Sequence, residues 1–221
     1  MGRIKNNISV IIPTCNRYDI LEENISNIMS QKVKPVDVII CDDSDRDYVN
    51  KNKTKIDFLK NYPLCKYFYC ARFDINGNKD YGLARSRNFG IVNASGDILV
   101  FIDDRLTPEN ENSIGNITKI LMNNPDKIWT FGNKGADKKA FVENWSAVRR
   151  SNIIRAGSFF ERIDKYGGMT REVFARFSYQ GFKFEYVHDA AAKQLAKSSN
   201  WEKKDKEVPE MRSLLEKLKL C

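Results

Sequence analysis

Two adjacent carboxylates lie near the end of the stretch SGDILVFIDDRLTP, and they are the side chains in this sequence best placed for chemistry. The five apolar residues Ile98–Ile102 predict a buried strand that runs directly into Asp103 and Asp104. Two carboxylates at the mouth of such a strand repel each other unless a cation or a hydrogen-bond donor lies beside them. Arg105 follows directly, and its positive charge either assists the cation or donor bound at the two carboxylates or competes with it.

Polar residues follow two other predicted strands as well. Residues 8–12 continue into PTCNR (residues 13–17), and residues 36–41 continue into DDSD (residues 42–45). Asp, Asn and Ser are common in turns and helix caps, which explains any one of these stretches alone. In a parallel α/β sheet, however, ligands bind beyond the carboxyl ends of the strands. Three polar ends at one edge of one sheet therefore predict a single pocket.

The strands that carry these ends alternate with helices in the first half of the chain. Apolar periodicity predicts helices over residues 18–31, 55–62 and 82–93, with a further strand over residues 66–71. Continuously apolar strands that alternate with helices are typical of a parallel sheet covered on both faces. The sequence therefore predicts an α/β fold with a mostly parallel sheet and helices on both faces.

The second half of the chain is less regular. We expect helices over residues 110–123, 151–157 and 170–181, with Thr170 as the N-cap of the last helix and Gly181 at its end. Further strands are expected over residues 127–131, 141–148 and 183–187. An amphipathic C-terminal helix is expected over residues 208–220, with Pro209 in its first turn.

The composition is that of an ordinary globular protein, with 42% hydrophobic and 30% charged residues. No apolar run approaches the roughly 18 residues that span a bilayer, and the N-terminus lacks the pattern of a signal peptide, so we expect a cytoplasmic protein. The five cysteines are scattered, without the second cysteine pair or histidine cluster of a zinc site. Free thiols in a reducing compartment are the simplest interpretation.

Positive charge is concentrated in one segment. The chain carries a formal net charge of +8, and residues 146–183 contain eight basic and only three acidic residues. Such a segment is either solvated surface or a face for a phosphate-bearing partner. Charge alone therefore keeps a nucleic-acid partner open.

Four blocks of the sequence carry a resemblance to a known family. They are SVIIPTCNR, VIICDDSD, GLARSRNFGIVNASGDILVFIDDRLTP, and the pair NWSAVRRSNIIRAGSFFERI and GGMTREVFARFSYQGFKFEYV. The first two are similar to the opening strands of the family 2 glycosyltransferases, and the third resembles the run that ends in the family's Asp-x-Asp site. The last pair is similar to the acceptor-side half. The resemblance implies the GT-A fold, with a Rossmann-like sheet, a small acceptor-side extension and a C-terminal helix.

The resemblance also implies an activity, which is the transfer of a sugar from a nucleotide sugar, favouring a UDP-sugar, to a hydroxyl acceptor with inversion. Pro13, Thr14 and Asp43 would cradle the base, and Asp43 would accept the imide N–H of uracil or thymine. Arg87 would reach the pyrophosphate. The full set implied to bind the nucleotide sugar is Pro13, Thr14, Asn16, Arg17, Asp42, Asp43, Arg87, Asp103, Asp104 and Arg105.

A divalent metal, Mn²⁺ or Mg²⁺, is implied in the same way, because the developing charge of the diphosphate must be stabilised. Asp104 would act in catalysis as a ligand of this metal. His188 would be a second metal ligand, but it is equally suited to capping a strand. Arg105 interrupts the Asp-x-Asp pattern, so either Asp104 holds the metal or Arg105 supplements the cation directly. Cys15 stands where the family often has an aromatic residue, which weakens stacking on the base.

The family's acidic pair, which usually provides the catalytic base, is replaced here by Met169 and Thr170. Glu172 is the nearest carboxylate. It is either the catalytic base or a structural acid paired with Arg176, four residues further along a helix.

The acceptor is placed by the resemblance beside the basic segment, with Arg149, Arg150 and Trp145 facing it. An acceptor that bears phosphates, such as duplex DNA with hydroxylated bases or a teichoic acid, would match that charge. We expect one GT-A domain in which residues 1–108 bind the nucleotide sugar and residues 109–192 face the acceptor, followed by a helical tail over residues 193–221.

Three alternative functions have their own support or test in the sequence. A non-catalytic nucleotide-sugar-binding relative would explain Arg105 and the GGMT stretch. A nucleic-acid-binding module would explain the charge. A nucleotidyltransferase would need a glycine-rich, basic loop after the first strand, and PTCNR does not provide one.

Overall fold

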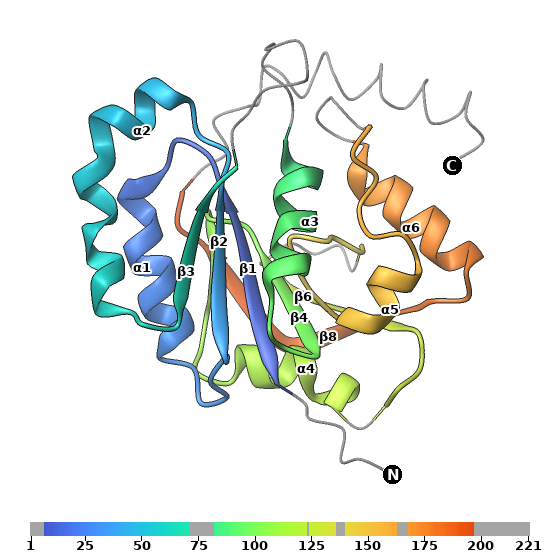
Figure 1. Ribbon diagram of the computed structural model, residues 1–221. Helices are drawn as coiled ribbons and strands as arrows, with labels where there is room; N and C mark the ends of the chain where they lie inside the picture. Colours follow the sequence, from blue (N-terminus) through green and yellow to red (C-terminus); the bar gives the residue numbers. More distant parts are fainter. Residues whose placement is uncertain (1–6, 71–81, 123, 136–139, 163–167, 197–221) are drawn as a thin grey trace.

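The computed structural model describes residues 7–70, 82–122, 124–135, 140–162 and 168–196 of the 221-residue chain. An eight-stranded sheet in the order β3-β2-β1-β4-β7-β6-β8-β5 lies at its centre, with helices against both faces (Figure 1). The strands are β1 (Ile8–Thr14), β2 (Asp37–Asp42), β3 (Cys65–Tyr69), β4 (Ile98–Ile102), β5 (Leu106–Pro108), β6 (Ile128–Asn133), β7 (Trp145–Arg149) and β8 (Lys183–Gln194). The helices are α1 (Tyr18–Met29), α2 (Arg46–Asn52), the 3₁₀ helix η1 (Lys53–Asn61), α3 (Leu83–Asn93), α4 (Ser113–Met122), α5 (Arg150–Arg155) and α6 (Met169–Tyr179).

The sheet is parallel in its first half and mixed in its second. β3, β2, β1 and β4 run parallel to one another. β7 is antiparallel to both β4 and β6, while β6 is parallel to β8. The short β5 pairs antiparallel with the end of β8. The parallel sheet expected from the first half is confirmed, and β7 and β5 add antiparallel pairs beyond it.

Two apolar cores lie on the two faces of this sheet. Because side chains alternate along a strand, Val10 and Ile12 pack on one face and Ile11 packs on the other. Residues of α1, η1 and α4 complete the core around Val10, whereas residues of α3, α5 and α6 complete the core around Ile11. Helices therefore cover both faces, as predicted.

The main differences from the predicted elements concern α2, β7 and β8. No buried residue marks α2, so apolar periodicity could not detect it, and η1 follows it directly. β7 begins at Trp145 rather than at residue 141, and the side chains of Glu143 and Asn144, just before it, bind Arg87 and Asp103. β8 continues beyond residue 187 to Gln194, where its end pairs with β5.

The start of α6 also differs from the prediction. Gly168 is the N-cap and the helix begins at Met169, so the expected cap at Thr170 is wrong. Gly181 follows the helix with a φ of +84°, a left-handed conformation that favours glycine, and it ends the helix as predicted. The C-terminal helix expected over residues 208–220 lies outside the described residues.

The cysteines within the described residues are Cys15, Cys41, Cys65 and Cys70, and all four are free thiols as expected. In the part of the chain that the structure covers, we find no helix with the length and apolar character required to cross a membrane. The division into donor and acceptor halves stays a prediction, since one continuous sheet includes strands from both.

Candidate functional site

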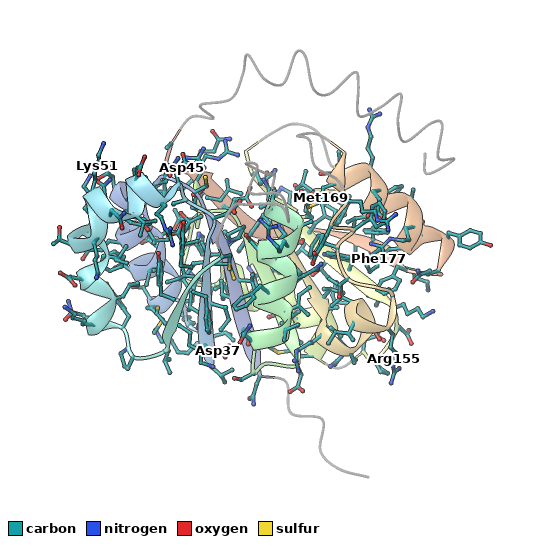
Figure 2. The ribbon with its side chains drawn as sticks, turned by 45° about the horizontal axis from the view of Figure 1, so that its top comes forward. Asp37, Asp45, Lys51, Arg155, Met169 and Phe177 are labelled. Carbon is teal, nitrogen blue, oxygen red and sulfur yellow. The ribbon has the colours of Figure 1, made fainter. Side chains whose placement is uncertain are left out.

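The polar ends of β1, β2 and β4 meet at one edge of the sheet, which we call the carboxyl edge. The backbone N–H of Asp43 donates to the carbonyl of Thr14 at 2.8 Å and joins the ends of β2 and β1. The Thr14 hydroxyl donates to Asp104 Oδ2 at 3.0 Å and joins β1 to the residues after β4. Figure 2 shows Asp45 and Met169 toward this end of the molecule and Asp37 at the opposite end. The prediction that the three ends lie together is therefore confirmed.

Asp104 is held inside the protein. Its side chain is only 3% exposed, and its Oδ1 accepts a hydrogen bond from Arg17 Nη1 at 3.1 Å. Burial raises the pKa of the Asp104 carboxyl above its usual value; Arg17 and the Thr14 hydroxyl oppose the rise, and the charge of Asp103 adds to it. Asp104 therefore fastens the end of β4 to the end of β1.

Asp103 belongs to a set of buried ion pairs around Arg87 of α3. The Arg87 side chain is fully buried, and its Nη2 donates to Asp103 Oδ1 at 2.9 Å while its Nη1 donates to Glu143 Oε1 at 3.1 Å. Asp103 Oδ2 accepts a further hydrogen bond from Asn144 Nδ2 at 3.1 Å. We use the name ion cluster for five residues: Arg17, Arg87, Asp103, Asp104 and Glu143.

Glu143 is a site residue that sequence reasoning missed. It is buried just before β7, and its Oε2 accepts a hydrogen bond from the Thr170 hydroxyl in the first turn of α6. Burial opposes ionisation, but the Arg87 guanidinium and the Thr170 hydroxyl outweigh it and hold the pKa of the Glu143 carboxyl below its usual value. An acid inside the largely apolar stretch FVENWSAV was the signal that could have identified it.

Two further cations lie beside the ion cluster. Lys134 follows β6, its Nζ donates to Asn144 Oδ1 at 2.8 Å, and its charge interacts with those of Asp103, Glu143 and Arg105. Burial lowers the pKa of the Lys134 ammonium, and the two carboxylates oppose that shift. Arg105 is half-buried, and among the described residues its guanidinium makes no hydrogen bond or ion pair.

Asp42 is surrounded by hydroxyl groups. It has no exposed surface, and the hydroxyls of Tyr18, Tyr67 and Ser44 all donate to its carboxylate. Burial, together with the bonded carboxylate, raises the pKa of both tyrosine hydroxyls, so they stay protonated as donors. We call these four residues the hydroxyl network. The expectation that Asp42 binds the nucleotide is corrected, because its carboxylate is enclosed behind the carboxyl edge.

Asp43 lies against the start of α3. A Cβ placed on Gly82 would lie 2.6 Å from Asp43 Oδ1 and 2.7 Å from Oδ2, so only glycine permits this approach. Arg85 Nη2, in the first turn of α3, is 4.0 Å from Asp43 Oδ1. The Asp43 carboxylate is thus held at the carboxyl edge between the end of β2 and the start of α3.

Asn16 joins the loops that follow β1 and β2. Its Nδ2 donates to Asp45 Oδ2 at 3.0 Å, and its Oδ1 accepts the backbone N–H of Asp45 at 3.1 Å. Its φ of +56° is left-handed, which asparagine tolerates better than most residues. Pro13, one of the residues expected at the base, is buried in β1 beside Cys41 of β2.

Arg149 and Arg150 lie at the opposite end of the sheet from the carboxyl edge. In the antiparallel pair of β4 and β7, Arg149 aligns with Ile98, the first residue of β4. Arg149 donates to carbonyl oxygens at the end of α4 and Arg150 to those of Ile91 and Val92 at the end of α3. Cations suit such positions, because helix C-termini present unpaired carbonyls. The expected role of both arginines at the acceptor is therefore corrected.

Trp145 and Glu172 are buried in structural contacts. Trp145 is fully buried, and its Nε1 donates to the carbonyl of Ala190 at 2.8 Å, so its ring does not face an acceptor. Glu172 is 2% exposed and pairs with Arg176, which also donates to two carbonyls of the 156–158 loop. Of the two roles expected for Glu172, the structural pair with Arg176 is the one observed.

The residues at this edge do not fit a divalent metal. Mg²⁺ and Mn²⁺ prefer carboxylate oxygens, but Asp103 is paired with Arg87 and Asp104 with Arg17, so protein cations already balance both negative charges. The His188 side chain is 77% exposed and contacts Asp189 at 3.0 Å, so it does not join Asp104 as expected. In the described ranges, no group of three or more His, Cys, Asp or Glu side chains is arranged to hold a metal.

Solved structures define the class of this fold. A mannosyltransferase of Pyrobaculum calidifontis in complex with GDP-Man and Mn²⁺ has a TM-score of 0.72 at 17% identity, covering 96% of this chain and 64% of the other. GalNAc-T7 with UDP, GalNAc and Mn²⁺ has a TM-score of 0.68 at 15% identity, covering 90% of this chain and 46% of the other. TarS of S. aureus has a TM-score of 0.65 at 15% identity, covering 85% and 60%. The fold is therefore the GT-A fold of glycosyltransferases.

Sequence comparison gives the family. Residues 9–189 match Glycosyl transferase family 2, and the chain belongs to that family. A GalNAc(5)-diNAcBac-PP-undecaprenol beta-1,3-glucosyltransferase of Campylobacter jejuni is 31% identical over 172 residues, or 72% of this chain and 52% of the relative. An uncharacterized glycosyltransferase of Rickettsia conorii is 33% identical over 96 residues, or 43% of this chain and 14% of the relative. The chain thus spans about half the length of the first relative and less of the second.

Proposed function

We propose that this chain transfers a sugar from a UDP-sugar to an acceptor hydroxyl with inversion at the anomeric carbon. The observation that carries the proposal is the carboxyl edge, where Asp43 and Asp103 follow the ends of β2 and β4 and are joined through Thr14 and Asp104. A nucleoside diphosphate has an uncharged base with N–H donors at one end and a charged diphosphate at the other. The Asp43 carboxylate suits the first part, and the ion cluster with its neighbouring cations suits the second.

The preference for uracil comes from the family resemblance, and Asp43 provides a carboxylate that suits it. This carboxylate is an acceptor for the single imide N–H of uracil, and Gly82 leaves the carboxylate room at the start of α3. Guanine presents two adjacent N–H donors that a carboxylate also accepts. The Pyrobaculum calidifontis structure holds GDP-Man and the GalNAc-T7 structure holds UDP, so UDP and GDP must be compared directly.

Glu143 replaces Glu172 in our proposal for the catalytic base. Like any glutamate it is ionised at neutral pH, as a proton acceptor must be, and the Thr170 hydroxyl holds it beside the first turn of α6. The lowered pKa makes it a weaker base, so the proposal rests on its position. Each carboxylate oxygen has a second lone pair beyond those used by Arg87 and Thr170. In the reaction, the acceptor oxygen bonds to the anomeric carbon, the bond from that carbon to the β-phosphate oxygen breaks, and the acceptor proton passes to Glu143.

An anionic polymer, such as modified DNA or a teichoic acid, stays our proposal for the acceptor. Arg155 lies toward the end of the molecule opposite the carboxyl edge (Figure 2), so the support comes from Arg162 and Arg171, which are exposed. If six phosphates are engaged, acceptor affinity falls by a factor on the order of 10³ as salt rises from about 50 to 200 mM. Efficient use of a neutral oligosaccharide, with turnover constant across that range, would contradict an anionic acceptor.

Nucleotide binding is tested by titrating UDP and GDP into the wild type and Asp43→Ala in a calorimeter. We expect UDP to bind the wild type more tightly than GDP, and Asp43→Ala to lose UDP binding while its unfolding midpoint stays unchanged. Asp47→Ala, at an exposed acid of α2, is the matched control and should bind UDP normally. Wild-type UDP affinity in Asp43→Ala would show that the base lies elsewhere.

Catalysis is tested by measuring UDP release from UDP-sugars, with and without candidate acceptors. Glu143→Gln should bind UDP but release no product, whereas Glu172→Gln should keep its turnover number if it remains folded.

The second candidate function is a non-catalytic nucleotide-sugar-binding protein, favoured by Met169 and Thr170 in place of the family's acids. Tight binding of UDP-sugars by the wild type, without hydrolysis or transfer, would favour that function.

A further inference from the structure

Positive charge exceeds negative charge around the ion cluster. Within the described residues, the two arginines of the cluster face three carboxylates, and Lys134 and Arg105 lie beside them. Four cations therefore surround three acids before any donor binds. A bound diphosphate brings at least two more negative charges, so this end of the carboxyl edge already has positive charge available for it.

The two cations outside the cluster differ from Arg17 and Arg87 in what they contact. Arg17 and Arg87 donate to carboxylates at 2.9 to 3.1 Å. Lys134 has three N–H donors and uses one on the side-chain carbonyl of Asn144, a neutral group. Arg105 has five N–H donors and, among the described residues, pairs with no acid. Both cations keep donors for a ligand.

We infer that Arg105 and Lys134 bind the diphosphate of the donor and stabilise the departing UDP, which is a task that a divalent metal often performs in such reactions. The inference rests on the proposed function, because it assumes a nucleoside diphosphate donor. As the bond between the anomeric carbon and the β-phosphate oxygen breaks, its electron pair stays on that oxygen. The guanidinium of Arg105 contacts two phosphate oxygens as a fork, and the Lys134 ammonium adds a point charge.

The charges at this edge also oppose a metal in the same place. Asp103 and Asp104 are paired with Arg87 and Arg17, so a divalent ion would compete with two guanidinium groups for the same carboxylates. It would also be repelled by Arg105 and Lys134. Two protein cations avoid both costs.

The test compares UDP with uridine, by calorimetry, in buffer that contains either EDTA or Mn²⁺. Wild-type protein should bind UDP equally well in both buffers. Arg105→Ala and Lys134→Met should each weaken UDP binding by about tenfold, the equivalent of about 1.4 kcal/mol and close to the loss of one charge-assisted hydrogen bond. Uridine has no phosphate, so its affinity should not change in either variant. Arg155→Ala and Lys119→Ala, at exposed cations of α5 and α4, are the matched controls and should bind both ligands normally.

The outcomes separate this inference from the proposed function. UDP binding by the wild type that disappears in EDTA and returns with Mn²⁺ would overturn the inference and leave the proposed function standing. Wild-type UDP affinity in Arg105→Ala would also overturn the inference. Because Arg105 is half-exposed, its variant provides the test if Lys134→Met fails to fold. Failure of the wild type to bind UDP, GDP or uridine in either buffer would overturn the proposed function itself.

Discussion

The hydroxyl network and the ion cluster support the same edge of the sheet by different means. In the hydroxyl network, three uncharged hydroxyls surround the single carboxylate of Asp42. In the ion cluster, two guanidinium groups are shared among three buried or nearly buried carboxylates. Removing neutral donors from water costs less than removing ions, and neutral donors add no net charge to their surroundings. The first region therefore fixes backbone position, while the second also sets an electric field.

This difference matches the two ends of the proposed ligand. Asp42 immediately precedes Asp43, so the hydroxyl network holds the strand end that presents a carboxylate to the base. The ion cluster lies beside Arg105 and Lys134, where we place the charged diphosphate. Loss of one group should consequently have a larger effect in the ion cluster than in the hydroxyl network.

Arg87→Met is expected to have the largest effect. It removes the guanidinium that pairs with Asp103 and Glu143 and leaves two carboxylates without their main partner. Breaking a buried ion pair by removing one partner costs about 3–5 kcal/mol. Urea denaturation of Arg87→Met should show a loss of that size in the free energy of unfolding, whereas Arg171→Met, at an exposed arginine, should change it by less than about 0.5 kcal/mol. A loss below about 1 kcal/mol in Arg87→Met would mean that the cluster behaves like a surface ion pair.

Tyr67→Phe should have a smaller effect, because it removes one of several donors to Asp42 and keeps the ring. The hydroxyls of Tyr18 and Ser44 remain bonded to the carboxylate. A hydrogen bond to a charged group contributes about 1.5–3 kcal/mol, which sets the expected loss in the free energy of unfolding. Tyr179→Phe is the control, since that side chain is 94% exposed and its hydroxyl has no part in the network. An effect as large as that of Arg87→Met would remove the distinction between the two regions.

Much of the fold was predictable, because each buried strand is a short apolar run and the helices between the strands have clear apolar faces. β1, β2, β4, α1 and α3 all lie close to their predicted positions. α2 lacks buried residues, and β5 has only three residues whose pairing depends on the distant end of β8. Elements of that kind are fixed by tertiary contacts that no local pattern records.

The site was predictable only in part. Polar strand ends identified Asp43, Asp103 and Asp104 from local sequence, but which of them face a ligand depends on partners far along the chain. Thr14 and Arg17 enclose Asp104 from about 90 residues away, and Glu143 reaches Arg87 from the loop before β7. The basic segment misled the prediction for a similar reason. Charge counting cannot show that Arg149 and Arg150 are used to cap helices.

Gly82→Ala should act on the nucleoside side without affecting stability much. A Cβ at this position would lie within 2.7 Å of both oxygens of Asp43 and would push the carboxylate aside. The backbone φ of −81° at Gly82 is accessible to alanine, so the unfolding midpoint should stay near the wild-type value. We expect UDP affinity to fall by about tenfold, or about 1.4 kcal/mol. In an Asp43→Ala background the same change should have no further effect on UDP binding, and an additive loss would show that Gly82 acts independently of Asp43.

The smallest expected effect is on the pH dependence of stability, where two carboxyls of the ion cluster have opposite signs. The pKa of Glu143 is lowered in the folded protein, so its contribution to stability is present above its usual value of 4.5 and is lost as the pH falls through the lowered pKa. The pKa of Asp104 is raised from 3.8, so the folded state takes up its proton first and gains stability as the pH falls through the raised pKa.

Between about pH 5 and pH 3 the two contributions oppose each other, and each is limited to about 1.4 kcal/mol per pH unit. Unfolding free energies measured across that window should fall more steeply with acid in Asp104→Asn than in the wild type, and less steeply in Glu143→Gln. Equal slopes in all three proteins would show that neither carboxyl titrates differently in the folded and unfolded states, and the electrostatic account of the ion cluster would then fail.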